Sequence, residues 1–434
     1  MDILKFDLNE KGGKFKYMNA VNNGPLHNWH RNRRTNLENF KKAGIPFVRN
    51  HDASFCAAYG GEHVVDISAI FPNFDADPYD PESYDFVFTD ELIYTTLAGG
   101  SEIFYRLGQK IEHGIKKYHI FPPKDYQKWA VICEHIIRHY NEGWANGFNY
   151  NIKYWEIWNE ADGAEGFENA PTWQGTREEF FEMFITAALH LKKCFPDIKI
   201  GGPSLSWNEE YAEALLNECK KRGVEIDFFS WHTYTRDPKS ILPRAKLFDD
   251  ILKRTGYPDA ENICNEWNYL IGWVGEDYDT TFEHIHSIIG AAFTMAVMSV
   301  GQSSHLDMLM YYDAQPSCFN GIFDYYTLRP LKGYYPFLWF SKFYDMEAEI
   351  KCKTEADDIY TLCGVDNRGK TLSVITYYTA EENMPDKELK VDFGREGEYE
   401  IYLLDEEYSG ELVDTTSLLQ FKMKPNSCIM IKEK

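Results

Sequence analysis

Short apolar runs alternate with longer amphipathic stretches from about residue 15 to residue 344. The apolar runs read KFKYMNAV, IPFVRNHD, SEIFYRLG, YWEIWNE, IKIGGPS, IDFFSWHTY, NICNEWNY and LDMLMYYD. In the stretches between them, such as PKDYQKWAVICEHIIRHYNEGW, apolar residues recur with the spacing of a helix. Strands that alternate with helices are typical of parallel βαβ units, so eight such units predict a closed (β/α)₈ TIM barrel over residues 15–344.

An open, doubly wound α/β sheet would show the same alternation. Such a sheet normally carries a glycine-rich phosphate loop after its first strand. No loop of that kind follows KFKYMNAV, and none of the Gly-Gly pairs at 12–13, 60–61, 99–100 and 201–202 forms one. We therefore favour the barrel.

The pattern changes at residue 345. The segments DDIYTLCGV, TLSVITYYT, ELKVDFG, YEIYLLDEE and SCIMIKEK alternate with period two or are rich in β-branched residues, and turn signals such as DNRGK separate them. This pattern predicts a small antiparallel β-sandwich domain over residues 345–434. We expect residues 1–14, which contain the strand-like ILKFDL, to join it, because the two ends of a chain often meet in space.

Composition narrows the choice of partners. A formal net charge of −23 argues against nucleic acid, whose phosphates need clustered Lys and Arg. No apolar stretch reaches transmembrane length and the N-terminus lacks a signal-peptide pattern, so no membrane partner is expected. Nine scattered cysteines without a CxxC pair fit reduced thiols in the cytoplasm. The oligomeric state stays open, with a homo-oligomer among the options.

Asn-Glu dipeptides occur six times, and their positions relative to the strands separate them. Only Glu160 and Glu266 directly follow apolar runs, YWEIWNE and NICNE, which are the fourth and seventh predicted strands. The carboxyl ends of barrel strands are where catalytic residues lie, and strands four and seven face each other across the mouth. Two opposed carboxylates are what glycoside hydrolysis requires. In a partly desolvated pocket, the pKa of one glutamate can be raised so that it acts as an acid.

The motifs WNEA, SWHTY and CNEWN resemble glycoside hydrolases of clan A, and most of all family 39, which contains β-xylosidases and α-L-iduronidases. The resemblance spans the chain and implies a retaining O-glycosyl hydrolase without a cofactor or metal. It implies Glu160 as general acid/base, Glu266 as nucleophile and Asn159 as the ligand of the sugar 2-hydroxyl, whereas exo action is expected from the loops described below.

The same resemblance suggests further substrate-binding residues. They are Arg49 and His51 in FVRNHD, His232 and Tyr234 in SWHTY, and Trp267 beside the nucleophile. The eighth-strand segment MLMYYDAQPS matches no family specificity, and its Tyr311 could line the pocket or belong to the core. A cationic Arg49 near Glu266 would keep that carboxylate ionised. The chain departs from the family pattern at Ala161, where proline is common, and at Asn265, where threonine is common. These departures leave the sugar open: a β-D-xyloside is expected first, with α-L-arabinoside, α-L-iduronide and β-glucoside as alternatives.

Other motifs and other classes of function compete with this interpretation. HIIRH at 135–139 has the spacing of a zinc site but lacks the glutamate of the metalloprotease motif, and we interpret it as helix surface. HNWH at 27–30 could reach the pocket through Trp29 or His30, and Tyr312 and Asp313 could line it or be structural. A carbohydrate-binding barrel without turnover remains an alternative, whereas a metal-dependent amidase would need a His-x-His on the first strand. Long loops at 52–88 and 161–175 favour an enclosed pocket and exo action.

Overall fold

The computed structural model describes residues 1–27, 34–52, 63–164, 169–354 and 356–434. Eight parallel strands form a closed barrel in chain order, and pairing of the last strand with the first closes it. They are β2 (Tyr17–Asn22), β3 (Phe47–Asn50), β4 (Glu102–Leu107), β5 (Tyr154–Ile157), β6 (Lys199–Leu205), β7 (Phe228–Thr235), β8 (Glu261–Tyr269) and β9 (Met308–Tyr311). The predicted barrel is confirmed, and β5 and β8 are its fourth and seventh strands.

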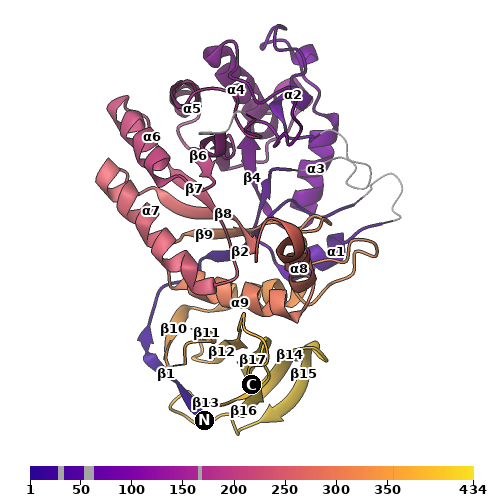
Figure 1. Cartoon of the computed structure of the whole chain (residues 1–434), viewed down its shortest axis with the longest axis vertical. Coiled ribbons are helices and arrows are strands. Elements are labelled where there is room, and N and C mark those ends of the chain that lie inside the picture. The colour runs from indigo at the N-terminus through magenta and orange to yellow at the C-terminus, as the bar shows by residue number, and fades with distance from the viewer. Residues whose placement is uncertain (28–33, 53–62, 165–168, 355) are drawn as a thin grey trace.

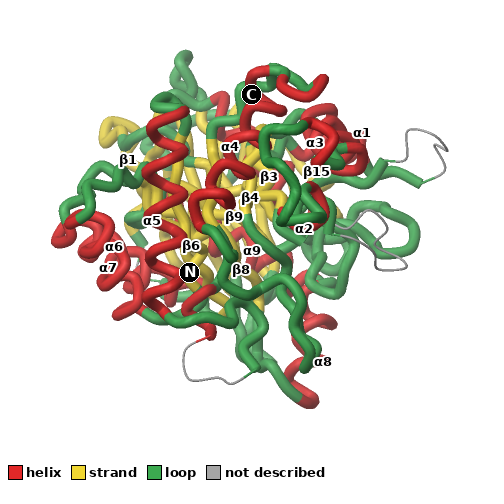
Figure 2. The backbone as a smooth tube through the Cα atoms, turned by 90° about the horizontal axis from the view of Figure 1, so that it is seen from above, coloured by secondary structure: helices red, strands yellow, loops and turns green. Residues whose placement is uncertain are grey.

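Helices surround this barrel (Figure 2). They are α1 (Leu37–Ala43), α2 (Ile67–Ile70), α3 (Val87–Ala98), α4 (Tyr126–Glu142), α5 (Arg177–Cys194), α6 (Glu209–Lys221), α7 (Ile241–Thr255), α8 (Gly275–Ile285), α9 (Ile288–Gln302) and α10 (Tyr334–Ser341). Single 3₁₀ turns lie at Pro81–Ser83, Trp144–Asn146, Ala161–Ala164, Pro238–Ser240 and Lys342–Asp345. Capping matches the sequence: Thr176 and Glu179 form a capping box at the start of α5.

The stretch TTFEHIHSIIGAAFTMAVMSVG, residues 280–301, is one continuous helical pattern in the sequence, but the structure divides it into α8 and α9. The Ser287 side chain accepts a hydrogen bond from the backbone N–H of Ile289, and so starts a new helix. Gly290 lies against the last carbonyls of α8, where a Cβ would come within 2.5 Å of the Ile285 oxygen. The two helices meet at 78°. Among the described residues no single helix is long and apolar enough to cross a membrane, and α8 and α9 meet that test only as this bent pair.

The barrel interior is layered. Its lowest layer is apolar and consists of Ala20, Phe47, Phe104, Tyr154, Phe228, Ile263, Met308 and Met310. Above it lie fully buried charged side chains, among them Arg49, Arg106 and Glu156. Buried charges persist only when they are paired and hydrogen-bonded, so this second layer is a polar network that forms the floor of the barrel mouth.

The C-terminal strands form one nine-stranded sheet together with β1 (Asp2–Lys11). They are β10 (Ala348–Lys353), β11 (Ile359–Val365), β12 (Thr371–Tyr377), β13 (Lys387–Asp392), β14 (Tyr399–Leu404), β15 (Ser409–Thr416), β16 (Gln420–Met423) and β17 (Ser427–Glu433). The pairing is antiparallel except between β1 and β13. Figure 1 shows this sheet beneath the barrel, next to α9, with both chain ends in it.

Strands far apart in this sheet share one hydrophobic core. Phe6 of β1 stacks on Phe393, and Phe393 stacks on Tyr399 of β14, with ring centroids 5.2 and 5.5 Å apart. Since β1 and β14 lie near opposite ends of the strand order, the sheet folds over and closes on itself as a sandwich does.

Replacing Phe6 with alanine tests whether β1 is part of this core. Phe6 is 3% exposed, so Phe6→Ala is expected to reduce the unfolding free energy by about 3–5 kcal/mol, measured by urea denaturation. Ile3→Ala on the same strand is the matched control, because Ile3 is 45% exposed and its loss is expected to change stability by no more than about 0.5 kcal/mol. Equal effects of the two substitutions would contradict the packing of β1.

Candidate active site

Glu160 and Glu266 meet at the mouth of the barrel. Glu266 lies within β8, and Glu160 follows β5 by three residues. Side-chain oxygens of both and a ring nitrogen of His232, on β7, all lie within 4.8 Å of one another. His232 stands between them: its Nδ1 is 2.7 Å from Glu160 Oε1, and its Nε2 is 3.7 Å from Glu266 Oε2.

Glu160 reaches this position because the chain turns sharply after β5. Trp158 and Glu160 adopt left-handed backbone conformations, with φ of 70° and 51°. Such residues cost about 1–3 kcal/mol each and persist only where the surroundings fix them. Here the Glu160 N–H donates to the Ser204 carbonyl (2.9 Å), and Thr172 Oγ1 donates to the Glu160 carbonyl (2.7 Å). These bonds aim the carboxyl group at the mouth.

Arg49 of β3 is fully buried beneath the two glutamates, and each of its five N–H donors is used. The acceptors are Glu156 Oε2 (2.7 Å), Asn22 Oδ1 (2.9 Å), Glu266 Oε2 (3.2 Å), Asn159 Oδ1 (2.7 Å) and Ser204 Oγ (2.7 Å). One guanidinium therefore connects Glu266 to residues on three other strands, which are β2, β5 with its end, and β6.

Sequence reasoning missed Glu156 and Ser204. Glu156 is fully buried in β5 and also accepts hydrogen bonds from Ser230 (2.5 Å) and Asn265 (2.6 Å). The signal was present, because a carboxylate inside the apolar run YWEIW must find a buried cation. Ser204 Oγ lies 2.5 Å from His232 Nε2, and nothing in its short run IKIGGPS marks it out.

Asn159 and His51 present unsatisfied polar atoms. Asn159 Oδ1 accepts hydrogen bonds from Arg49 and Ser204, and this fixes the amide orientation. His51 Nδ1 accepts from Arg106 Nε at 3.2 Å, so Nε2 carries the proton. Asn159 Nδ2 and His51 Nε2 are both buried and make no hydrogen bond to the described residues, although His51 Nε2 lies 3.3 Å from Asp52 Oδ1. Since buried donors rarely stay unpaired, these two atoms are suited to a ligand.

Burial sets the protonation of the three central groups. It raises the pKa of Glu160 to about 8, reinforced by the Asp162 carboxylate and opposed by Arg49. Burial also raises the pKa of Glu266, while Arg49 and the Tyr234 hydroxyl, which donates to Oε1 at 2.6 Å, limit the rise. Burial lowers the pKa of His232 to about 4. At neutral pH, therefore, Glu160 keeps its proton and His232 is neutral.

An aromatic wall borders Glu266. The ring of Tyr234 lies 5.1 Å from Trp273 and 6.0 Å from Phe319, and Trp273 is 56% exposed. Tyr312 extends this wall: its hydroxyl donates to Asp52 Oδ2 at 2.6 Å, and its ring packs near Phe319. Sequence reasoning did not identify Trp273 or Phe319, because each lies in a loop without periodicity.

The structure does not bring Trp267 and Tyr311 into the site. A register shift in β8 between Cys264 and Trp267 lets both Asn265 and Glu266 point inward, and Trp267, which follows them, points outward. Trp267 is 1% exposed and packs against Phe293 of α9 and against Tyr311. Tyr311 likewise faces outward, since Met310 belongs to the barrel interior. Both are core residues, which corrects the expectation that Trp267 binds the substrate and that Tyr311 could line the pocket.

The other motifs that the sequence singled out do not contribute described residues to the pair of glutamates. His135 and His139 of HIIRH are buried, not on the surface: His139 stacks on Phe86 at 3.6 Å and bonds to Asp90. Asp313 is buried and bonded by Asn23 and Ser317, with its pKa raised by burial to about 7. Trp29 and His30, with parts of the loops at 52–88 and 161–175, lie outside the described residues.

Two carboxyl groups that face each other at the fourth and seventh barrel strands are the arrangement that glycoside hydrolysis uses, and comparisons with known proteins point to the same class. Residues 47–247 match the model of glycosyl hydrolases family 39. A β-xylosidase of Geobacillus stearothermophilus is 22% identical over 338 residues, 69% of this chain and 62% of that protein. A β-xylosidase of Caldicellulosiruptor saccharolyticus is 32% identical over 165 residues, 36% of this chain and 32% of that protein.

Solved structures share the whole fold. A glucosidase from Croceicoccus marinus superimposes with a TM-score of 0.79 at 21% identity, covering 100% of this chain and 99% of its own. The matched segments span less than two thirds of the length of either β-xylosidase. Over residues 47–247, less than half of its length, the chain is similar to glycosyl hydrolases of family 39.

The raised pKa of Glu160 predicts a pH-dependent gain from Glu160→Gln. As pH rises from 4.5 towards 8, the carboxyl group ionises in the unfolded chain but not in the folded one, so the wild type loses stability. Glutamine does not titrate. The variant is therefore expected to melt above the wild type at pH 8 and with little difference near pH 4.5, measured by thermal denaturation. Glu218→Gln on α6 is the control, and a gain independent of pH would contradict the raised pKa.

Proposed function

We propose that this protein is a retaining glycoside hydrolase that removes a terminal sugar from short oligosaccharides, with β-xylosidase-like specificity. The main support for this proposal is that side-chain oxygens of Glu160 and Glu266 lie within 4.8 Å of each other. Retaining enzymes hold their two carboxyl groups about 5–5.5 Å apart, whereas inverting enzymes need about 6.5–9.5 Å to admit a water molecule. The short separation favours double displacement.

In this proposal Glu160 is the general acid/base and Glu266 the nucleophile. Glu160, protonated at neutral pH, donates its proton to the glycosidic oxygen as that bond breaks, and Glu266 Oε forms a covalent bond to the anomeric carbon. Glu160, now a carboxylate, then takes a proton from water. The water oxygen attacks the anomeric carbon, and Glu266 leaves. Arg49 and Tyr234 hold Glu266 and stabilise its negative charge when it is released.

We assign sugar binding to two buried N–H donors that make no hydrogen bond to the described residues. Asn159 Nδ2 and His51 Nε2 are oriented by Arg49 and Arg106 and would donate to sugar hydroxyls. A buried donor that is unpaired without ligand gains a full hydrogen bond when the sugar arrives. Tyr234 and Trp273 would supply a ring surface for the apolar face of a sugar.

A β-D-xyloside is the proposed substrate because the two relatives compared above are β-xylosidases. The structural likeness to a glucosidase supports a β-glucoside as the second candidate. An α-L-iduronide is less well supported, since a uronate needs a cation. All five N–H donors of Arg49 bond to protein acceptors, and Lys239 pairs with Asp357 at 3.4 Å, so neither cation is available to a uronate. An α-L-arabinoside is a further candidate, and the panel of glycosides described below distinguishes it from the others.

We further propose a cytoplasmic location, which fits the eight free cysteines within the described part of the chain. We also propose that the protein forms a homo-oligomer, which analytical ultracentrifugation tests.

A panel of para-nitrophenyl glycosides tests the activity. Glu160→Ala and Glu266→Ala are each expected to lower kcat by about 10²–10⁴-fold, because each removes a group that acts on the reacting atoms. Azide is expected to rescue Glu266→Ala with a glycosyl azide of inverted configuration, since azide enters the space that the nucleophile vacates.

Glu218→Ala is the matched control, because Glu218 also follows an asparagine but lies on the outer helix α6. Activity that survives the loss of Glu266 would overturn the nucleophile assignment. Thermal stabilisation by a sugar with no release from any glycoside would favour the carbohydrate-binding alternative.

A further inference from the structure

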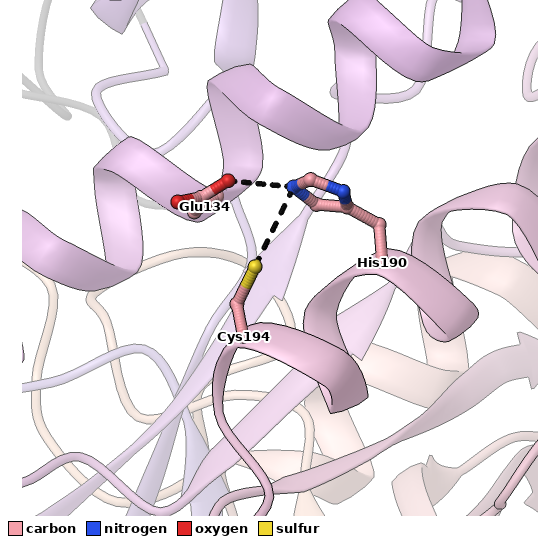
Figure 3. Close-up of side chains that lie close together, drawn as sticks. All are labelled: Glu134, His190 and Cys194. Atoms are coloured by element: carbon pink, nitrogen blue, oxygen red, sulfur yellow. Dashed lines mark hydrogen bonds and ion pairs between the residues drawn. The ribbon is translucent and has the colours of Figure 1, made fainter.

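A second group of metal-ligating side chains lies between two outer helices. Glu134 of α4 and His190 and Cys194 of α5 point toward one another (Figure 3). His190 Nε2 is 2.6 Å from Glu134 Oε2 and 3.8 Å from Cys194 Sγ. The three ligand atoms lie within 4.8 Å of one another. His190 and Cys194 are one helical turn apart, so both face the same side of α5.

This group is separate from the candidate active site. In a (β/α)₈ barrel each helix runs back from the mouth toward the opposite end of the strands. His190 and Cys194 belong to the last turns of α5, so they lie away from the mouth. The proposed glycosidase chemistry uses none of the three residues.

Neighbouring side chains already orient two of the ligand atoms. Arg138 Nε donates to Glu134 Oε1 at 2.7 Å, which leaves Oε2 facing His190. Gln127 Nε2 donates to His190 Nδ1 at 2.9 Å, so His190 Nε2 carries the proton that faces Glu134 Oε2. A metal would take the place of that proton, and a turn of the Gln127 amide would let its oxygen accept a proton from Nδ1. The Glu134 and His190 side chains are 12% and 18% exposed, so the ligand atoms are held by the protein and still open to an ion.

We propose that Glu134, His190 and Cys194 bind one zinc ion, with water as the fourth ligand. The ligand set of one thiolate, one imidazole and one carboxylate suits Zn²⁺ and excludes Mg²⁺ and Ca²⁺, which prefer oxygen. Bond lengths of about 2.3 Å to sulfur and about 2.0 Å to nitrogen and oxygen place tetrahedral ligands about 3.3–3.5 Å apart. The present 3.8 and 2.6 Å need only small side-chain adjustments.

Binding releases one proton to solvent. Zn²⁺ replaces the thiol proton of Cys194, while the His190 proton moves from Nε2 to Nδ1 and stays on the ring, and no redox partner is needed. The ion would join α4, which precedes β5, to α5, which follows it. Its effect is therefore stabilisation of the helices that flank the strand leading to Glu160.

Cobalt titration of the reduced full-length protein tests this site, because Co²⁺ bound to a thiolate gives a charge-transfer band that Zn²⁺ displaces. The wild type is expected to bind one Co²⁺ with this band, and Zn²⁺ is expected to raise its melting temperature. Cys194→Ser is expected to lose the band, and His190→Ala to weaken Zn²⁺ binding by at least about 100-fold, since even outer-shell substitutions cost about 10–100-fold.

Cys352→Ser in β10 is the control for unspecific binding to a half-buried thiol and is expected to keep the band. Circular dichroism checks that each variant is folded. A wild type without the thiolate band, or a band that persists in Cys194→Ser, would overturn the proposal and leave the three residues as a hydrogen-bonded helix contact. Glycoside hydrolysis by Cys194→Ser is expected to equal that of the wild type, so failure of this site and failure of the proposed function are distinguishable.

Discussion

The hydrogen bonds of the buried Arg49 guanidinium hold the candidate active site together. A fully buried cation is stable only if its charge is balanced and every donor is satisfied. Glu156 and Glu266 balance it, and Asn22, Asn159 and Ser204 take the remaining donors. These acceptors come from β2, β6 and β8 and from β5 and its end, so the floor of the barrel mouth cannot shift one strand without breaking a charged hydrogen bond.

The same cation helps to separate the two glutamates electrostatically. Glu266 receives direct hydrogen bonds from Arg49 and Tyr234, whereas Glu160 receives none from a cation and lies near Asp162. Desolvation acts on both, so the carboxyl group with less compensation keeps its proton to higher pH. Two carboxyl groups whose environments push their pKa values apart can take the roles of acid and nucleophile. His232 lies between the two glutamates and bonds to Glu160, but it is neutral and therefore adds no charge to the pair.

Sequence periodicity predicted the barrel and its strand order because each βα unit carries its own local pattern, and Glu160 and Glu266 stood out because both directly follow apolar strands. Glu156 and Ser204 could not be assigned in the same way, since their importance depends on which cation the closed barrel brings to them. Trp267 was named as a substrate ligand because it adjoins a motif, whereas the structure packs it against α9; for Tyr311, the structure agrees with the core alternative. The break between α8 and α9 was missed because Ser287 and Gly290 lie within an otherwise continuous helical pattern.

The central claim is that two glutamates held close together, one protonated and one supported by Arg49, define a retaining site. The most direct test is to determine the anomeric configuration of the first product. Time-resolved proton NMR measures it on whichever glycoside the protein cleaves. The account predicts that the newly released sugar has the configuration of the substrate before mutarotation. First appearance of the opposite anomer would require a water molecule between the two carboxyl groups, and would contradict the separation on which the proposed mechanism rests.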